Sequence, residues 1–136
     1  WMLADDVLIW HKADVSIAYV CEDPTKFTSH SDSATTVPIG YEAITELPRT
    51  EGYVLSMAHS TKGYSFAEKV GGSSNKGYCD YYWTPTGGST WSAVGWYGAL
   101  LSASAVNGAP AGFGSLDARY RSSNANAYFG FRLCRF

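Results

Sequence analysis

The chain has 136 residues, a formal net charge of -2, a hydrophobic content of 46% and a charged content of 16%. This length suits one globular domain whose core needs neither a metal nor a disulfide, and the composition excludes a disordered chain. Because the charge is slightly negative and no apolar run approaches the ~20 residues of a membrane helix, we expect neither nucleic-acid binding nor membrane insertion.

The first predicted elements are two short strands in "DDVLIWHKADVSIAYVCEDP". β-Branched and aromatic residues favour strands at Val7–Trp10 and Val15–Val20, and the polar residues between them, His11–Asp14, favour a turn. This pattern predicts a hairpin at the start of the chain, followed by a loop over Asp23–Thr36.

Further strands are predicted before residue 70. The stretch "VPIGYEAITELP" forms a third apolar segment bounded by Pro38 and Pro48, and "GYVLSMAHS" predicts a strand at Tyr53–Ala58. The polar segment that follows is compatible with a helical turn through Phe66–Val70. Helical signals are otherwise weak, because no stretch shows a sustained 3.6-residue period with caps at both ends.

The composition changes from Gly71 onward. Lys, Glu and Met are absent after Lys76, and Gly, Ala, Ser, Asn and aromatic residues take their place. Because neither half contains an obvious complete core, we expect a single domain over residues 1–136, with a strand-rich part at 1–70 and a ligand-binding part at 71–136. Residue 1 is Trp, so we expect the sequence to be a fragment or a processed product.

The residues that carry chemistry in enzymes form no catalytic pattern. Motifs of the HExxH, Gly-x-Ser-x-Gly, Walker and GxGxxG types are absent. The histidines, His11, His30 and His59, lie in separate turn or loop contexts, where each is expected to be a solvated or hydrogen-bonded polar residue. We therefore expect a chain that is not an enzyme and that has no cofactor and no metal site.

The cysteines, Cys21, Cys79 and Cys134, are far apart and have no CxxC spacing, which disfavours a zinc site or a redox motif. Their odd number favours buried, free thiols in a protein assembled in a reducing compartment. A single disulfide between Cys79 and Cys134 is the alternative.

Aromatic residues are the most informative feature, since the chain has 10 Tyr and 5 Trp beside 14 Gly. Tyr with Ser, Gly and Asn is the composition of antibody-like binding loops, where rigid rings supply contact area at low entropic cost. Some of these rings belong to the core, for which we predict Trp83, Trp91 and Phe131. Exposure is predicted for Tyr97, Tyr120 and Tyr128.

Short motifs in the second half carry a family resemblance. They are "GGSTW" (87–91), "NGAPAG" (107–112), "ARYRSSNANAYF" (118–129) and "GFRLC" (130–134). In this order they resemble the end of a C-type lectin-like domain and, more narrowly, the variable proteins of diversity-generating retroelements. The N-terminal half resembles the lead-in of such proteins from phages and prophages of gut Bacteroidetes.

The resemblance implies an α+β class with a C-type lectin-like fold, rich in strands and loops and with little helix. In this family, template adenines become any base, so an Asn codon diversifies but cannot reach Lys, Glu, Gln, Met or Trp. The absence of Lys, Glu and Met after Lys76 agrees with this rule, and Trp91 and Trp96 then belong to the scaffold or to unvaried contact surface. The expected ligand-facing positions are Tyr97, Leu101, Ser102, Ser104, Val106, Asn107, Phe113, Leu116, Asp117, Tyr120 and Tyr128.

The resemblance also implies a function. We expect a non-catalytic receptor-binding or adhesin domain of a phage tail fibre or another virion appendage, with Arg119 and Asp117 tuning its charge complementarity. A calcium-dependent sugar site is not expected, because the Glu-Pro-Asn, Gln-Pro-Asp and Trp-Asn-Asp triplets are absent. The expected partners are a host cell-surface protein or glycan, other virion subunits and further copies of the chain in a homotrimer.

Two alternatives for the biological setting stay open at this point. One is a bacterial pilus-tip or cell-surface adhesin that carries the same type of domain. The other is a structural virion decoration or collar domain, in which the Gly- and aromatic-rich face packs against neighbouring subunits instead of a host.

Overall fold

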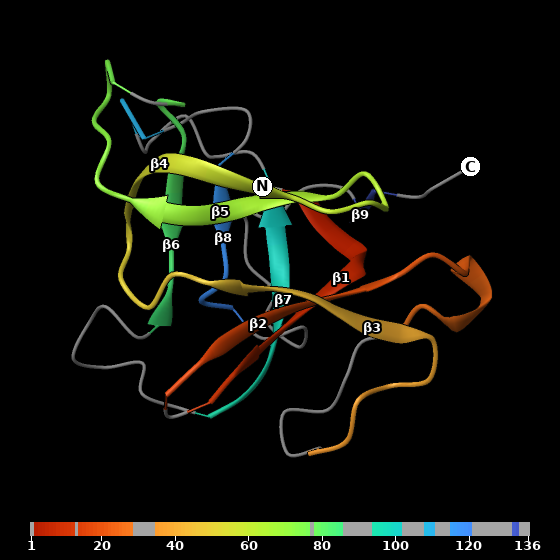
Figure 1. The fold of residues 1–136 in the computed structure, drawn as a ribbon. Coiled ribbons are helices and arrows are strands. Elements are labelled where there is room, and N and C mark those ends of the chain that lie inside the picture. Colours follow the sequence, from red (N-terminus) through yellow and green to blue (C-terminus); the bar gives the residue numbers. More distant parts are fainter. Residues whose placement is uncertain are drawn as a thin grey trace.

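Strands make up most of the regular structure of the chain (Figure 1). The computed structural model describes residues 2–12, 14–28, 35–76, 78–85, 94–101, 108–110, 115–120 and 132–133. Within these residues the only helix is a 3-10 turn at Pro24–Lys26, where the Asp23 side chain caps the Thr25 N–H group. No helix of the described residues is long and apolar enough to cross a membrane. The prediction of a strand-rich fold with little helix is confirmed, whereas the α part of the α+β class is not seen in these residues.

Within the described residues the strands form one nine-stranded sheet in the order β3-β2-β1-β7-β8-β6-β4-β5, with β9 paired to β1 beside this path. Most neighbours are antiparallel, but β6 pairs with β8, and β1 with β9, in parallel. Their bounds are β1 Met2–His11, β2 Ser16–Cys21, β3 Tyr41–Leu47, β4 Gly52–His59, β5 Ser65–Val70, β6 Tyr81–Trp83, β7 Gly95–Leu101, β8 Leu116–Asp117 and β9 Arg132–Leu133.

The predicted N-terminal hairpin is present as β1 and β2. Side chains alternate between the two faces of the sheet, as expected for a strand period of two. Val7 and Ile9 of β1 enter the larger core, whereas Leu8 and Trp10 pack on the other face against Trp96 of β7. Both faces of this part of β1 are therefore buried, which explains why Val7–Trp10 is apolar without interruption.

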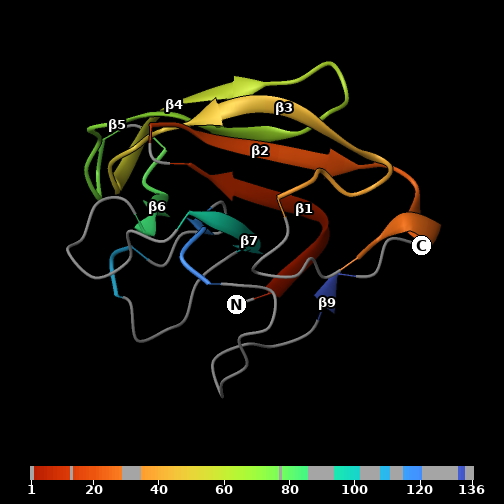
Figure 2. The same ribbon diagram turned by 90° about the horizontal axis from the view of Figure 1, so that it is seen from below.

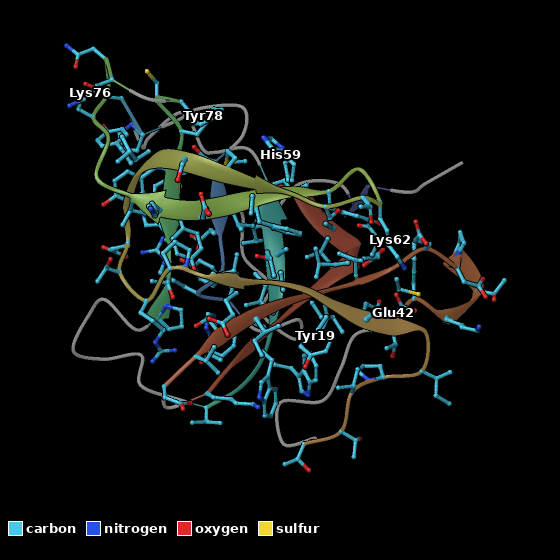
Figure 3. All side chains as sticks on the ribbon, in the orientation of Figure 1. Tyr19, Glu42, His59, Lys62, Lys76 and Tyr78 are labelled. Carbon is cyan, nitrogen blue, oxygen red and sulfur yellow. The ribbon has the colours of Figure 1, made fainter. Side chains whose placement is uncertain are left out.

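The sheet curls on itself, so that its two ends approach each other (Figure 2). β3 and β5 are the first and last strands of the path, and they lie against each other. Lys62, in the turn between β4 and β5, forms ion pairs with Glu42 of β3 and with Glu22 (Figure 3). The hydrogen bond and the charge of Lys62 lower the pKa of the Glu42 carboxyl. The curled sheet encloses the larger core on its inner face.

Two predictions about the first half need correction. Residues Phe66–Val70 form most of strand β5 and not a helical turn, because Phe66 and Ala67 are buried in the larger core while their strand pairs with β4. Of the cysteines, Cys21 is a buried thiol as predicted, but Cys79 is only half-buried. Cys134 lies outside the described residues.

The buried phenol of Tyr82 makes the stability of the fold vary with pH in the alkaline range. Its side chain lies in the larger core and its hydroxyl donates to the Pro48 carbonyl over 3.2 Å. Burial is the main cause that raises the pKa of the Tyr82 phenol above its ordinary value. In the unfolded chain the same phenol ionises at about pH 10. The contribution of the protonated Tyr82 phenol to the free energy of unfolding is therefore fully present below that pH and is lost as the pH rises above it.

We therefore expect Tyr82→Phe to change the pH dependence of stability. At about pH 8 the variant has lost the hydrogen bond to Pro48, so its free energy of unfolding is about 1 kcal/mol lower than that of the wild type. By about pH 11 this difference is smaller, because the wild type is destabilised by ionisation of Tyr82 in its unfolded state and Phe has no proton to lose. Urea unfolding at both pH values measures the difference. The control is Tyr78→Phe, which removes the same hydroxyl group from an exposed position. A constant difference for Tyr82→Phe would contradict the argument.

Candidate functional site

Five of the expected ligand-facing residues lie in the described part of the chain: Tyr97, Leu101, Leu116, Asp117 and Tyr120. They come from β7, from β8 and from the segment directly after β8, and these elements are neighbours in the sheet. The other expected positions lie outside the described residues, and these are Ser102, Ser104, Val106, Asn107, Phe113 and Tyr128.

The structure corrects the expected exposure of three residues. Tyr97 is only 2% exposed and packs edge-on against His11, with 4.8 Å between ring centroids. Leu116 belongs to the same core, and the side chain of Asp117 is only 1% exposed. Tyr97 and Leu116 are inner side chains of the central strands β7 and β8 and lie in the larger core, whereas Asp117 lies on the opposite face and is paired there with Arg119.

Leu101 and Tyr120 are half-buried, so both remain candidates for contact with a ligand. Tyr120 is anchored through its backbone, because its carbonyl accepts a hydrogen bond from the Gly98 N–H group over 2.9 Å. Of the aromatic residues predicted for the core, Trp83 is buried as expected. Trp91 and Phe131 lie outside the described residues.

A row of aromatic rings in mutual contact lies on the outer face of β4 and β6. Tyr53 and Tyr81 are direct partners in the ladder, and their rings meet edge to face with 5.0 Å between centroids. The ring of Tyr81 in turn contacts that of Trp83, with 4.6 Å between the ring centroids. Tyr82, between them, points into the core, so the alternation along β6 sorts its rings onto two faces. Tyr53 and Tyr81 are half-buried and carry the accessible part of the row.

Arg119 extends this row at the end of β8. Its guanidinium carbon lies 5.6 Å from the ring centroid of Trp83 and 5.8 Å from that of Tyr120. Asp117 is paired with Trp83 in the ladder, so both side chains belong to the same face of the sheet. Such cation–π contacts with a planar guanidinium are favourable and fix its orientation.

The Asp117 carboxylate holds the guanidinium in a two-pronged ion pair. Nε of Arg119 donates to Oδ1 over 3.0 Å and Nη2 donates to Oδ2 over 2.7 Å. The backbone N–H group of Arg119 also donates to Oδ1 over 3.0 Å. This geometry leaves the side chain of Arg119 28% exposed while Asp117 is buried behind it. Asp117 is therefore a partner of Arg119 and not a contact residue.

The electrostatics of this face follow from the same pair. Burial alone would lower the pKa of the Arg119 guanidinium, but the hydrogen bonds and charge of Asp117 outweigh burial and raise it. Burial is also the main cause that raises the pKa of the Tyr81 phenol, with a smaller contribution from the charge of Glu51 and an opposing one from Arg119. Tyr81 is consequently a neutral phenol and Arg119 a cation at physiological pH.

We call these residues the aromatic–arginine surface, and its members are Tyr53, Tyr81, Trp83, Arg119 and Tyr120. Of these, sequence reasoning included only Tyr120 among the ligand-facing residues. The signal for Tyr81 and Trp83 was present in "YCDYYWTP", because a strand period of two places them on one face and Tyr82 on the other. Tyr53 could only be added from the strand pairing, which joins residues far apart in the sequence.

His11 forms a second polar cluster, on the inner face. Its Nδ1 lies 2.7 Å from Ser16 Oγ and its Nε2 lies 3.0 Å from the Ala118 carbonyl oxygen. Since a carbonyl only accepts, Nε2 carries a proton, and in the neutral ring Nδ1 accepts from Ser16. Arg49 Nη1 donates to the same Ser16 Oγ over 2.9 Å. His11 and Ser16 are both fully buried, so this arrangement ties strands together out of reach of a substrate.

His11 and His59 are hydrogen-bonded as expected, but they are the last residues of β1 and β4 and not turn or loop residues. Nδ1 of His59 lies 2.7 Å from Ser65 Oγ at the surface. His30 lies outside the described residues. Within the described part of the chain, no group of three His, Cys, Asp or Glu side chains is arranged to hold a metal ion. Comparisons with protein-family models, with curated proteins and with solved structures find no match for this chain.

Proposed function

We propose that this chain is a non-catalytic recognition domain of a phage tail fibre or another virion appendage, which binds a molecule on the bacterial surface. The observation that carries the proposal is the aromatic–arginine surface, where accessible Tyr rings flank an oriented guanidinium. Tyr and Arg are the side chains that most often dominate the energy of recognition surfaces. Flat rings and fixed hydrogen-bond donors suit binding, and the raised pKa of the Tyr81 phenol keeps it neutral and thus a weak nucleophile.

We also propose that the chain has a C-type lectin-like fold of the kind found in the variable proteins of diversity-generating retroelements. The support is the ordered set of motifs in the second half, together with the strand-rich scaffold of the described residues. In such a design a rigid sheet orients contact residues, while the segments after β7 and β8 tolerate sequence change. Buried Tyr97, Leu116 and Asp117 belong to the rigid part.

The proposal is tested by binding to bacterial cells. The biotinylated chain, displayed in several copies on streptavidin, is incubated with a panel of gut Bacteroidetes and counted by flow cytometry, because multiple copies amplify a modest affinity. We expect Tyr81→Ala and Tyr120→Ala each to lower binding at least about tenfold, as for central residues of a contact surface. Ile39→Ala is the control, since Ile39 is apolar and 84% exposed but lies outside this surface.

Two outcomes would count against the proposal. Cell binding that is equal for the wild type, Tyr81→Ala and Tyr120→Ala would show that the aromatic–arginine surface is not the contact surface. Variants that bind cells normally but fail to assemble with virion subunits would favour the structural decoration domain. A melting curve for each variant confirms that the fold is retained.

A further inference from the structure

The donors of Arg119 are only partly used inside the protein. Asp117 takes the Nε side of the guanidinium, and no described residue accepts a hydrogen bond from Nη1. Arginine has five N–H donors in a fixed plane, so the Nη1 side is a rigid donor edge that no described residue uses. With 28% of its side chain exposed, Arg119 can present this edge to a ligand without leaving Asp117.

The neighbouring rings offer a second type of contact. The hydroxyl groups of Tyr53 and Tyr81 make no hydrogen bond to any described residue, although both rings are half-buried and in edge-to-face contact. Each ring therefore presents an apolar face or edge together with a polar tip. A ligand that matches them needs apolar C–H groups on one side and several hydroxyl groups around its rim.

The charge balance of the surface decides between charged and uncharged ligands. Among the described residues, Asp117 and Arg119 neutralise each other, and Glu51 adds a negative charge close enough to raise the pKa of both Tyr81 and Arg119. An anionic ligand would meet an ion pair that is already balanced and a further carboxylate, so it gains little from Arg119. An uncharged ligand avoids the cost of bringing a second charge to this site.

From these three features we infer that the aromatic–arginine surface binds an uncharged saccharide. A pyranose ring has an apolar C–H face that packs on Tyr53 and Tyr81, and its hydroxyl groups accept from Arg119 Nη1 and pair with the phenol groups. The inference rests on the proposed function and specifies its ligand class. Asp117 acts as a positioning residue, because it holds the plane of Arg119 without touching the sugar.

The inference is tested with defined sugars and the folded chain. Binding of methyl α-mannoside, methyl β-galactoside and N-acetylglucosamine is compared with binding of glucuronic acid and N-acetylneuraminic acid by saturation-transfer NMR and calorimetry. We expect at least one uncharged sugar to bind and the acidic sugars to bind more weakly. Arg119→Lys keeps the charge but loses the planar donors, and Tyr81→Ala loses the ring, so each should weaken binding about tenfold. Tyr81→Phe should have a smaller effect, and Ile39→Ala none.

The outcomes separate the ligand class from the function. Preference for the acidic sugars, or unchanged sugar affinity in Tyr81→Ala, would overturn the inference. A failure of every sugar to bind, together with cell binding that survives periodate oxidation of surface glycans, would overturn it too and leave the proposed function standing. Sugar binding that depends on Tyr81, in a chain that attaches to no bacterial cell, would support the saccharide site and count against the proposed function.

Discussion

Replacing Tyr97 with Ala is expected to lower the free energy of unfolding by about 4 kcal/mol, because a large ring is removed from a packed interior. Tyr97 is 2% exposed, is paired with Ile9 across β7 and β1, and contacts His11 edge-on. The lost ring contacts and the cavity left behind both contribute. Since a small domain has a total stability of about 5–15 kcal/mol, the variant should still fold but with a much lower midpoint.

The matched control for this prediction is Tyr78→Ala. Tyr78 is the same residue type but 51% exposed, in the segment that precedes β6 (Figure 3), and its loss should change stability by no more than about 0.5 kcal/mol. Urea unfolding followed by circular dichroism measures both variants, and Tyr97→Phe serves as a milder probe of the same site. If Tyr97→Ala were as stable as Tyr78→Ala, the ring would lie at the surface, as the sequence alone had suggested.

The comparison of Tyr97 with Tyr120 shows what the sequence could predict about the site. Both are Tyr residues in a segment rich in Gly, Ala and Ser, and composition treats them alike. Strand β7 is buried on both faces over Gly95–Leu100, so its pattern lacks the alternation that separates inside from outside. Only the pairing of β7 with β1 and β8 distinguishes a core ring from a contact ring.

Local patterns were sufficient for the first half of the fold. The β1–β2 hairpin and β4 follow from β-branched and aromatic runs with polar residues at the turns. Strand β5 was missed because Phe66 and Ala67 are adjacent and both buried, which breaks a period of two. The register between β4 and β5 shifts twice, and such irregularities displace side chains from simple alternation.

The ion pair of the site was beyond prediction for a different reason. Strand β8 has only two residues, Leu116–Asp117, which is too short to produce any pattern. A buried Asp is rare unless it is paired, so the partner had to be found in space. The spacing of Asp117 and Arg119 permits a local pair, but the contacts of Arg119 with Trp83 and Tyr120 arise only from the sheet.

His11 is the second position where a large effect on stability is expected. Its ring is 1% exposed and joins β1 to the start of β2 through Ser16, and to the segment after β8 through the Ala118 carbonyl. Ala118 directly follows Asp117 and precedes Arg119, so His11 also supports the base of the aromatic–arginine surface. Residues far apart in the sequence are thus tied together by one imidazole ring.

The variant His11→Ala should lose about 3 kcal/mol of unfolding free energy, because it leaves a cavity and takes a hydrogen-bond donor from a buried carbonyl. His59→Ala is the matched control: His59 also contacts a Ser hydroxyl at 2.7 Å but is exposed, so its loss should cost no more than about 0.5 kcal/mol. Both are measured by urea unfolding near neutral pH.

A double-mutant cycle with Ser16→Ala shows whether the hydrogen bond itself contributes. If the His11–Ser16 contact is a net stabilising bond, the two single losses should sum to about 1 kcal/mol more than the loss in the double variant. Additive losses would mean that His11 contributes through packing against Tyr97 and its bond to Ala118. Equal, small losses for His11→Ala and His59→Ala would contradict the buried position of His11 and, with it, its support of Arg119.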